Sequence, residues 1–261
     1  QEVISTLAHE YQHMIHFYQR DVLQGTTTPT WINEMLSMMA EDLIADTRGG
    51  RGPRGVDPVV YSGGGAGGVN NRYGRFPDYN YIPYASLSDW GGTGYVLDSY
   101  GLSYSFGAFV ARAYGGAPLA RNLVVDNPYS AADDILAHGV AAAGGPADAR
   151  LDDLLWRWGV SVLLSSDDTV QATDVEMNTG SWISSTLGST QYDLGSINAF
   201  NYEQGGTGGP DGPYIYTSAD YNVTELQPAS ALYYEFGTGL SGTVNTTVSV
   251  PGGAGLTVVV K

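Results

Sequence analysis

The chain of 261 residues has no cysteine, few basic residues and no long apolar run. Without cysteine there is neither a disulfide nor a thiolate metal site, so any zinc would have to be held by histidine and carboxylate. The formal net charge of −16 argues against nucleic acid or an anionic membrane surface as a partner. No apolar run approaches the roughly 18 residues of a transmembrane helix, so we expect no membrane span.

Glycine and tyrosine are abundant, with 36 and 19 residues. Together with many serines and threonines and no cysteine, this composition favours a secreted or cell-surface bacterial protein. From Trp158 onward, Lys261 is the only basic residue against ten Asp and Glu. These acidic residues could bind calcium in loops, but we favour a role in solubility.

The segment that carries chemistry is His9-Glu10-Tyr11-Gln12-His13, near the start of a helix expected over residues 2–20. Residues four apart lie on one face of a helix, about 6 Å apart along its axis. Two imidazoles so placed can both reach one zinc ion at roughly 2.0–2.1 Å. Glu10 would project beside them, where it can deprotonate a water.

The same helix shows an apolar stripe opposite its histidines. We expect the stripe to pack against the core and His9, His13 and His16 to face a cleft. His16 lies two turns from His9, too far to join the same ion, and suits a supporting or wall position. The stripe consists of Ile4, Leu7, Ala8, Tyr11, Ile15 and Tyr18.

A second helix, expected to start at Pro29-Thr30 with Thr30 as its N-cap and to stop at Arg48-Gly49-Gly50, supplies a third candidate ligand. Glu34 lies in the frame Trp31-Ile32-Asn33-Glu34, and Glu41 follows two turns later on the same face. A His-His-Glu set leaves the fourth position of zinc open, as in catalytic sites.

These two segments resemble the glutamate-ligand zinc peptidases, including the thermolysin and aminopeptidase/leukotriene-hydrolase families. Two sequence motifs are most similar to those of the hyicolysin-type bacterial secreted metallopeptidases. They are His9-Glu10-Tyr11-Gln12-His13-Met14-Ile15-His16-Phe17 and Asn33-Glu34-Met35-Leu36-Ser37. The resemblance covers residues 6–116 well and residues 131–164 loosely.

The resemblance implies one catalytic zinc held by His9, His13 and Glu34, with Glu10 as the general base. It further implies that Glu41 and Asn33 support the ligands from behind. Thermolysin's Asp four residues after its ligand Glu is Met38 here, so that contact is absent or supplied by Glu41. The acidic motif by which aminopeptidases hold the substrate amino group is also missing, so the resemblance does not imply exopeptidase action.

Ser99-Tyr100-Gly101, through Phe109 to Gly115-Gly116, resembles the aminopeptidase helix that carries a catalytic tyrosine. Tyr100 is therefore our candidate to donate a hydrogen bond to the substrate oxyanion. Tyr95 or Tyr104 would replace it if the register slips by a turn. His138 could fill the corresponding thermolysin-like histidine role, although its apolar neighbours favour a packing position.

The rest of the chain predicts an α+β protein: a zincin-like, mainly helical catalytic part followed by a small β-rich module. Further helices are expected over residues 100–114, the first capped by Asp98 or Ser99, then over 131–143 and 148–164. Short strands are expected at 214–216, 231–236, 243–250 and 256–261. We place the boundary near Leu194, which gives a metallopeptidase domain over residues 1–194 and a β-rich module over 195–261.

These features predict a zinc-dependent peptidase that acts on proteins or peptides by metal-activated water. The alternative is a surface, adhesion or binding module that keeps the fold without turnover. Because the metal helix opens the chain, we also expect a preceding segment of the same precursor to supply the strand that holds substrate.

Overall fold

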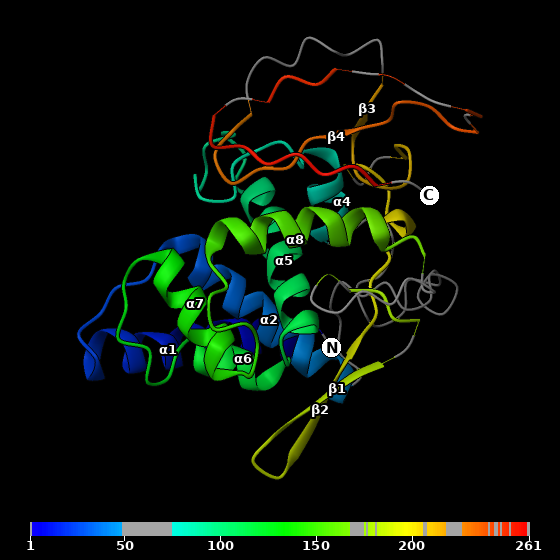
Figure 1. Cartoon of the computed structure of the whole chain (residues 1–261). Coiled ribbons are helices and arrows are strands. Elements are labelled where there is room, and N and C mark those ends of the chain that lie inside the picture. The colour runs from blue at the N-terminus through cyan, green and yellow to red at the C-terminus, as the bar shows by residue number, and fades with distance from the viewer. Residues whose placement is uncertain are drawn as a thin grey trace.

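The computed structural model describes residues 2–48 and 75–167, and residues 175–259 except 176, 181, 206, 207, 218–225, 240, 243, 244, 246 and 251. The helices gather into one body. The C-terminal segments run along one side of it beyond α8, and the β1–β2 hairpin projects from the opposite side (Figure 1). This is the α+β arrangement that the sequence predicts, a mainly helical N-terminal region followed by a small β-strand region.

The described helices and strands follow one another along the chain with few long breaks. They are α1 (Glu2–His16), the π-helix η1 (Phe17–Leu23), α2 (Thr30–Arg48), α4 (Arg75–Tyr81), α5 (Val96–Ala113), α6 (Ala117–Asn122), α7 (Ala132–Ala142), α8 (Leu151–Leu164), β1 (Trp182–Leu187), β2 (Thr190–Gly195), the 3-10 helix η2 (Ala199–Asn201), β3 (Ile215–Tyr216) and β4 (Tyr233–Tyr234). None of the described helices is both long and apolar enough to cross a membrane.

The core forms where α2 and α5 cross. Met35 and Met39 of α2 are almost fully buried, and they lie against Gly107 of α5. A Cβ on Gly107 would stand 2.6 Å from the Cγ of Met35, so the glycine permits this close approach. Trp158 of α8 closes the other side of α5, where its indole N–H donates to Ser105 at 3.0 Å.

A buried ion pair crosses the same core. Arg112 of α5 lies 2.8 Å from Asp42 of α2, and both side chains are almost fully shielded from solvent. The Arg112 Nε also donates to the carbonyl of Gly195 at 2.7 Å, at the end of β2. Breaking such a pair by removing one partner leaves a buried charge and strongly destabilises a fold. The ion pair therefore joins α5 to α2, and the bond from Arg112 to Gly195 connects both helices to the hairpin.

Helix α1 packs in a way that the sequence pattern does not predict. Its histidine side lies against α2, and the apolar stripe expected to enter the core faces solvent instead. Leu7 is 61% exposed and Tyr11 62%. The prediction of a core-facing stripe is wrong because the periodicity shows which residues share a face, but not which face meets the rest of the chain. The large exposed side chains here are Val3, Ile4, Leu7, Tyr11, Met14, Ile15, Phe17 and Tyr18.

The end of the first helix is also different from the prediction. It changes to a π-helix at Phe17, and the fully buried Arg20 anchors this segment. The guanidinium donates to the carbonyls of Asn127 and Tyr129 and to the Thr28 hydroxyl. These bonds hold the metal helix against the loop before α7.

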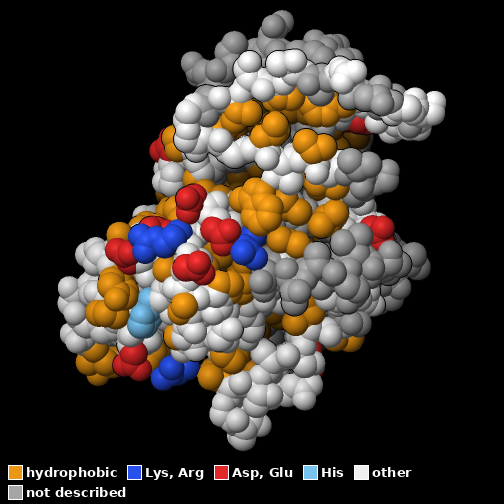
Figure 2. Space-filling view, viewed as in Figure 1, with side chains coloured by type: hydrophobic (Ala, Val, Ile, Leu, Met, Phe, Trp, Pro, Cys, Tyr) orange, Lys and Arg blue, Asp and Glu red, His pale blue; other side chains and the backbone are white. Residues whose placement is uncertain are grey.

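The described residues of the C-terminal part form two small sheets. Strands β1 and β2 form an antiparallel hairpin, with Trp182 opposite Gly195, and β3 pairs with β4 in parallel. Tyr233 of β4 is buried, and its hydroxyl meets that of Tyr79 of α4 at 2.8 Å. Figure 2 shows apolar side chains gathered where these segments meet the helical body, as this packing implies.

Several boundaries differ from the predictions. Helix α5 begins at Val96 with Tyr95 as its N-cap, so neither Asp98 nor Ser99 caps it. The β1–β2 hairpin, α4 and α6 were not predicted. No strand forms among the described residues of 243–250 and 256–261. The boundary near Leu194 remains a prediction.

Candidate metal centre

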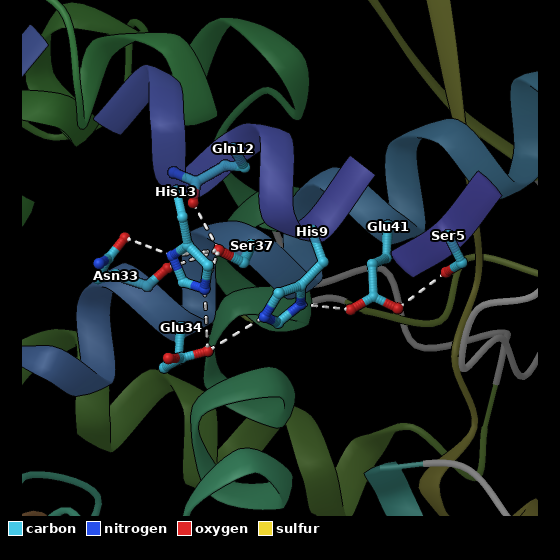
Figure 3. A network of polar contacts seen from close by, with 8 residues as sticks. All are labelled: Ser5, His9, Gln12, His13, Asn33, Glu34, Ser37 and Glu41. Carbon is cyan, nitrogen blue, oxygen red and sulfur yellow. Dashed lines mark hydrogen bonds and ion pairs between the residues drawn. The ribbon is translucent and has the colours of Figure 1, made fainter. Parts of the chain in front are cut away.

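Three candidate ligands from two helices converge on one point. His9 and His13 come from α1 and Glu34 from α2, and Figure 3 shows both imidazoles turned toward the carboxylate. His9 Nε2 lies 3.3 Å and His13 Nε2 lies 3.5 Å from Glu34 Oε2. The ligand atoms of the three residues all lie within 4.8 Å of one another.

This spacing fits zinc. A tetrahedral ion with bonds of about 2.05 Å separates its ligands by roughly 3.3 Å. Glu34 Oε2 is buried and has no hydrogen-bond partner among the described residues. A shielded carboxylate oxygen without a hydrogen bond is costly, and a cation would satisfy it. The residues present therefore fit the metal that the motif implies.

The other nitrogen of each histidine meets an oxygen. His9 Nδ1 lies 2.7 Å from Glu41 Oε1, and His13 Nδ1 lies 3.2 Å from Asn33 Oδ1. An acceptor at Nδ1 favours the proton there and leaves the Nε2 lone pair for a metal. Glu41 and Asn33, for which the resemblance implies a supporting role, each contact the Nδ1 of one histidine (Figure 3).

Two serines extend this network, and sequence reasoning gave neither of them a role. Ser5 donates to Glu41 Oε2 at 2.8 Å, which fixes the second oxygen of that carboxylate. Ser37 donates to Gln12 Oε1 at 2.5 Å and lies 3.1 Å from His13 Nδ1. Their spacing could have shown them, because Ser5 is one turn before His9 and Ser37 one turn after Asn33.

The carboxylates create a negative potential at the site. Contact with Glu34, and after it the hydrogen bond to Glu41, raises the pKa of His9 to about 9. Burial raises the pKa of Glu34, but His9 and His13 outweigh this effect and the net pKa is lowered. A potential that favours a proton on His9 also favours a cation, and metal binding would release that proton.

Glu10 and Tyr100 lie at the same site. Glu10 is exposed, and it is near enough to Tyr100 for its charge to contribute to the raised pKa of that residue. The Tyr100 side chain interacts electrostatically with the Glu34 carboxylate, and its ring centre lies 6.4 Å from that of His9. Burial, followed by the charges of Glu34 and Glu10, raises the pKa of Tyr100, so it stays a protonated donor at neutral pH.

The alternatives to Tyr100 lie elsewhere. Tyr104 is fully buried and hydrogen-bonded to Asp42, and Tyr95 is the exposed N-cap of α5. His138 of α7 contacts the carbonyl of Asp126 through Nε2 at 3.0 Å. His16 is buried at the end of α1 and takes no part in the convergence of ligands. Of these candidates, only Tyr100 touches the predicted ligand set.

Two helices that turn two histidines and a glutamate toward one point have the arrangement of the zinc metallopeptidase class. The comparison with known families agrees with this class. A family model described as Peptidase M30 matches residues 1–174, and the chain belongs to that family, the hyicolysin family of zinc metallopeptidases. No curated protein matches the chain.

Proposed function

We propose that the protein hydrolyses peptide bonds with one zinc ion held by His9, His13 and Glu34. The observation that carries this proposal is the convergence of the two Nε2 atoms on a buried carboxylate oxygen, for which the described residues provide no hydrogen bond. Membership in the M30 family supports peptidase activity and a metal. When bound, zinc supplies the Lewis acidity that makes water a nucleophile near neutral pH.

The side chains around the metal centre have separate roles in the reaction. Glu10 takes the proton of the attacking water and later passes it to the leaving amine. Tyr100 turns its O–H from Glu34 to the carbonyl oxygen of the scissile bond, where negative charge develops. Glu41 and Asn33 keep His9 and His13 in the orientation that holds the metal.

Substrate and location are also part of the proposal. An exposed Glu10 beside the ligands suits substrates that approach from solvent, and we propose peptides or unfolded protein segments. The composition, free of cysteine and rich in glycine and tyrosine, favours action outside a bacterial cell. The competing function is a binding module that keeps the metal without turnover, and it makes Glu10 dispensable.

The decisive test compares Glu10→Gln with His13→Ala in purified protein. We expect Glu10→Gln to retain about one zinc per chain by elemental analysis and to lose roughly 10²–10⁴-fold in casein or peptide cleavage. His13→Ala should lose both the metal and the activity.

Each of the other possible results of this test would contradict a different part of the proposal. Cleavage by Glu10→Gln at the wild-type rate would show that Glu10 is not the base. Equal zinc in His13→Ala and wild type would remove the proposed ligand set. A wild-type protein that binds zinc but cleaves no peptide would favour the binding module.

A further inference from the structure

The ring of Tyr100 contacts two side chains from other parts of the chain. The guanidinium carbon of Arg75, at the start of α4, lies 4.6 Å from the ring centre. Trp90 meets the same ring in a T-shaped contact, with ring centres 5.0 Å apart and planes at 76°. Both geometries are attractive, one through cation–π contact and the other through the edge and face of two aromatic rings.

The neighbours of Tyr100 in the sequence bring these two partners to it. Gly101 lies against α4, where a Cβ would stand 2.8 Å from both the Asp78 Cβ and the Tyr79 backbone nitrogen. Only glycine lets α4 come so close, and this approach places Arg75 over the ring. Ser99 is buried, and its hydroxyl accepts a hydrogen bond from the backbone N–H of Gly91 at 2.9 Å. That bond fixes the turn next to Trp90.

The held ring ends at the metal centre. The Tyr100 ring centre lies 6.4 Å from that of His9, and the side chain interacts electrostatically with Glu34 of α2. Arg75 lies on α4, Tyr100 on α5 and Trp90 in the turn between these two helices. A tyrosine side chain turns about two torsions, so the position of its hydroxyl depends on what holds the ring. An enzyme gains from a donor that is fixed before the reaction, because no reorganisation is then needed.

We propose that Arg75 and Trp90 are positioning residues that clamp the Tyr100 ring and so hold its hydroxyl beside the metal centre. This inference rests on the proposed function, in which Tyr100 donates to the oxyanion. It assigns a task to each residue of Ser99-Tyr100-Gly101. Ser99 fixes the turn of Trp90, Tyr100 carries the donor, and Gly101 admits the helix of Arg75.

A direct role in substrate binding is the rival for Arg75. Its guanidinium lies 3.7 Å from Asp78, and about a third of its side chain is exposed. The cation could therefore reach an acidic group of a substrate. The two roles differ in what they require, because a clamp acts only through Tyr100, whereas substrate binding does not depend on the tyrosine hydroxyl.

A double-mutant cycle separates these roles. The variants are Arg75→Met, Arg75→Lys and Trp90→Ala, each alone and combined with Tyr100→Phe, assayed for kcat and KM on an uncharged peptide. Arg121→Met is the matched control, since Arg121 also faces an aspartate, Asp126, at 3.8 Å but lies on α6. Zinc content and melting temperature show which variants remain folded and metal-bound.

For Tyr100→Phe we expect a fall in kcat of about 10²–10³-fold. Arg75→Met and Trp90→Ala should lower kcat by roughly 3- to 30-fold with little change in KM, and Arg75→Lys should restore most of it because it keeps a cation. In the Tyr100→Phe background neither substitution should cause a further loss of more than about twofold.

The contrary outcomes are distinct. Equal losses from Arg75→Met with and without Tyr100, or a change confined to KM, would overturn the clamp in favour of substrate binding. An unchanged kcat in folded, zinc-bound Arg75→Met and Trp90→Ala would also overturn it, while leaving the role of Tyr100 intact. Full activity of Tyr100→Phe would remove the oxyanion role and the clamp together, without affecting the zinc ligands or Glu10.

Discussion

The two sides of α1 differ in both chemistry and surroundings. One side carries Ser5, His9 and His13 and meets Glu34, Glu41 and Asn33 of α2. The other side is a row of large apolar side chains, and they are exposed in the part of the chain that the structure describes. The side held in place is therefore the polar one, because its hydrogen bonds have partners on α2.

This difference shows which interactions hold α1 against α2. Apolar burial normally contributes about 25 cal/mol for each Å² removed from water, and the exposed side of α1 gains little of it within the described residues. The α1–α2 contact depends instead on hydrogen bonds and charge, which are directional. Substitutions on the two sides should therefore have very different effects.

The largest effect should come from the polar side, at Glu41. Glu41→Gln keeps the shape but removes the charge behind His9, and we expect zinc affinity to fall by about 10- to 100-fold. Competition with a chromogenic chelator measures this change. Ser5→Ala, which leaves the contact between Glu41 and His9 in place, should cost less. Equal zinc affinity in Glu41→Gln and wild type would mean that α2 does not support the ligand.

An intermediate effect should come from His16, which is buried on the same side. Burial, followed by the charge of Arg20, lowers the pKa of His16 to about 4. The unfolded chain takes up a proton near pH 6.5 and the folded chain does not, so stability falls as the pH decreases below that value. We expect a loss of about 1 kcal/mol between pH 6.5 and 5.5 that His16→Leu lacks.

Urea unfolding of metal-free protein at a series of pH values measures this difference. All other titrating groups are common to the two proteins, so only the difference between their profiles reports on His16. Parallel profiles would show that His16 takes up its proton equally in both states.

The smallest effect should come from the apolar side. Leu7→Lys adds a charge to a side chain that is already 61% exposed, and we expect the free energy of unfolding to change by no more than about 0.5 kcal/mol. Met35→Ala, in the core of α2, should cost about 2–5 kcal/mol under the same conditions. A loss from Leu7→Lys as large as that from Met35→Ala would contradict the exposure of this side.

The sequence predicts the long helices and the convergence at the metal centre because both depend on regular spacing. His9 and His13 lie one turn apart on any helix, and Glu34 follows within the motif Trp31-Ile32-Asn33-Glu34. The support of the ligands by Glu41 and Asn33 is implied by the family resemblance, and periodicity adds only that Glu34 and Glu41 share one face of a helix. Tyr100 was found by resemblance alone, since nothing in its spacing links α5 to α2.

What the sequence does not predict depends on tertiary contacts. Helix α4 has only seven residues, too few for a periodic pattern, and its position depends on the space beside Gly101. The exposed side of α1 could not be foreseen because periodicity does not identify a partner. Alternation at residues 243–250 likewise predicts a strand only where another strand can pair with it. Val248 and Val250 are instead exposed.

The bond from Arg112 to Gly195 bears on where this protein can be divided. The Peptidase M30 match ends at residue 174, and every proposed ligand lies before that point. A recombinant fragment that stopped there would retain the whole metal centre but lack the carbonyl that the buried guanidinium requires. Arg112 pairs with Asp42 of α2, and the preceding residue on that helix, Glu41, contacts His9. Loss of the Gly195 acceptor would therefore disturb a part of α2 that is adjacent to the metal centre. We therefore expect the cooperative folding unit to extend beyond the matched residues 1–174 and to reach at least the end of the hairpin.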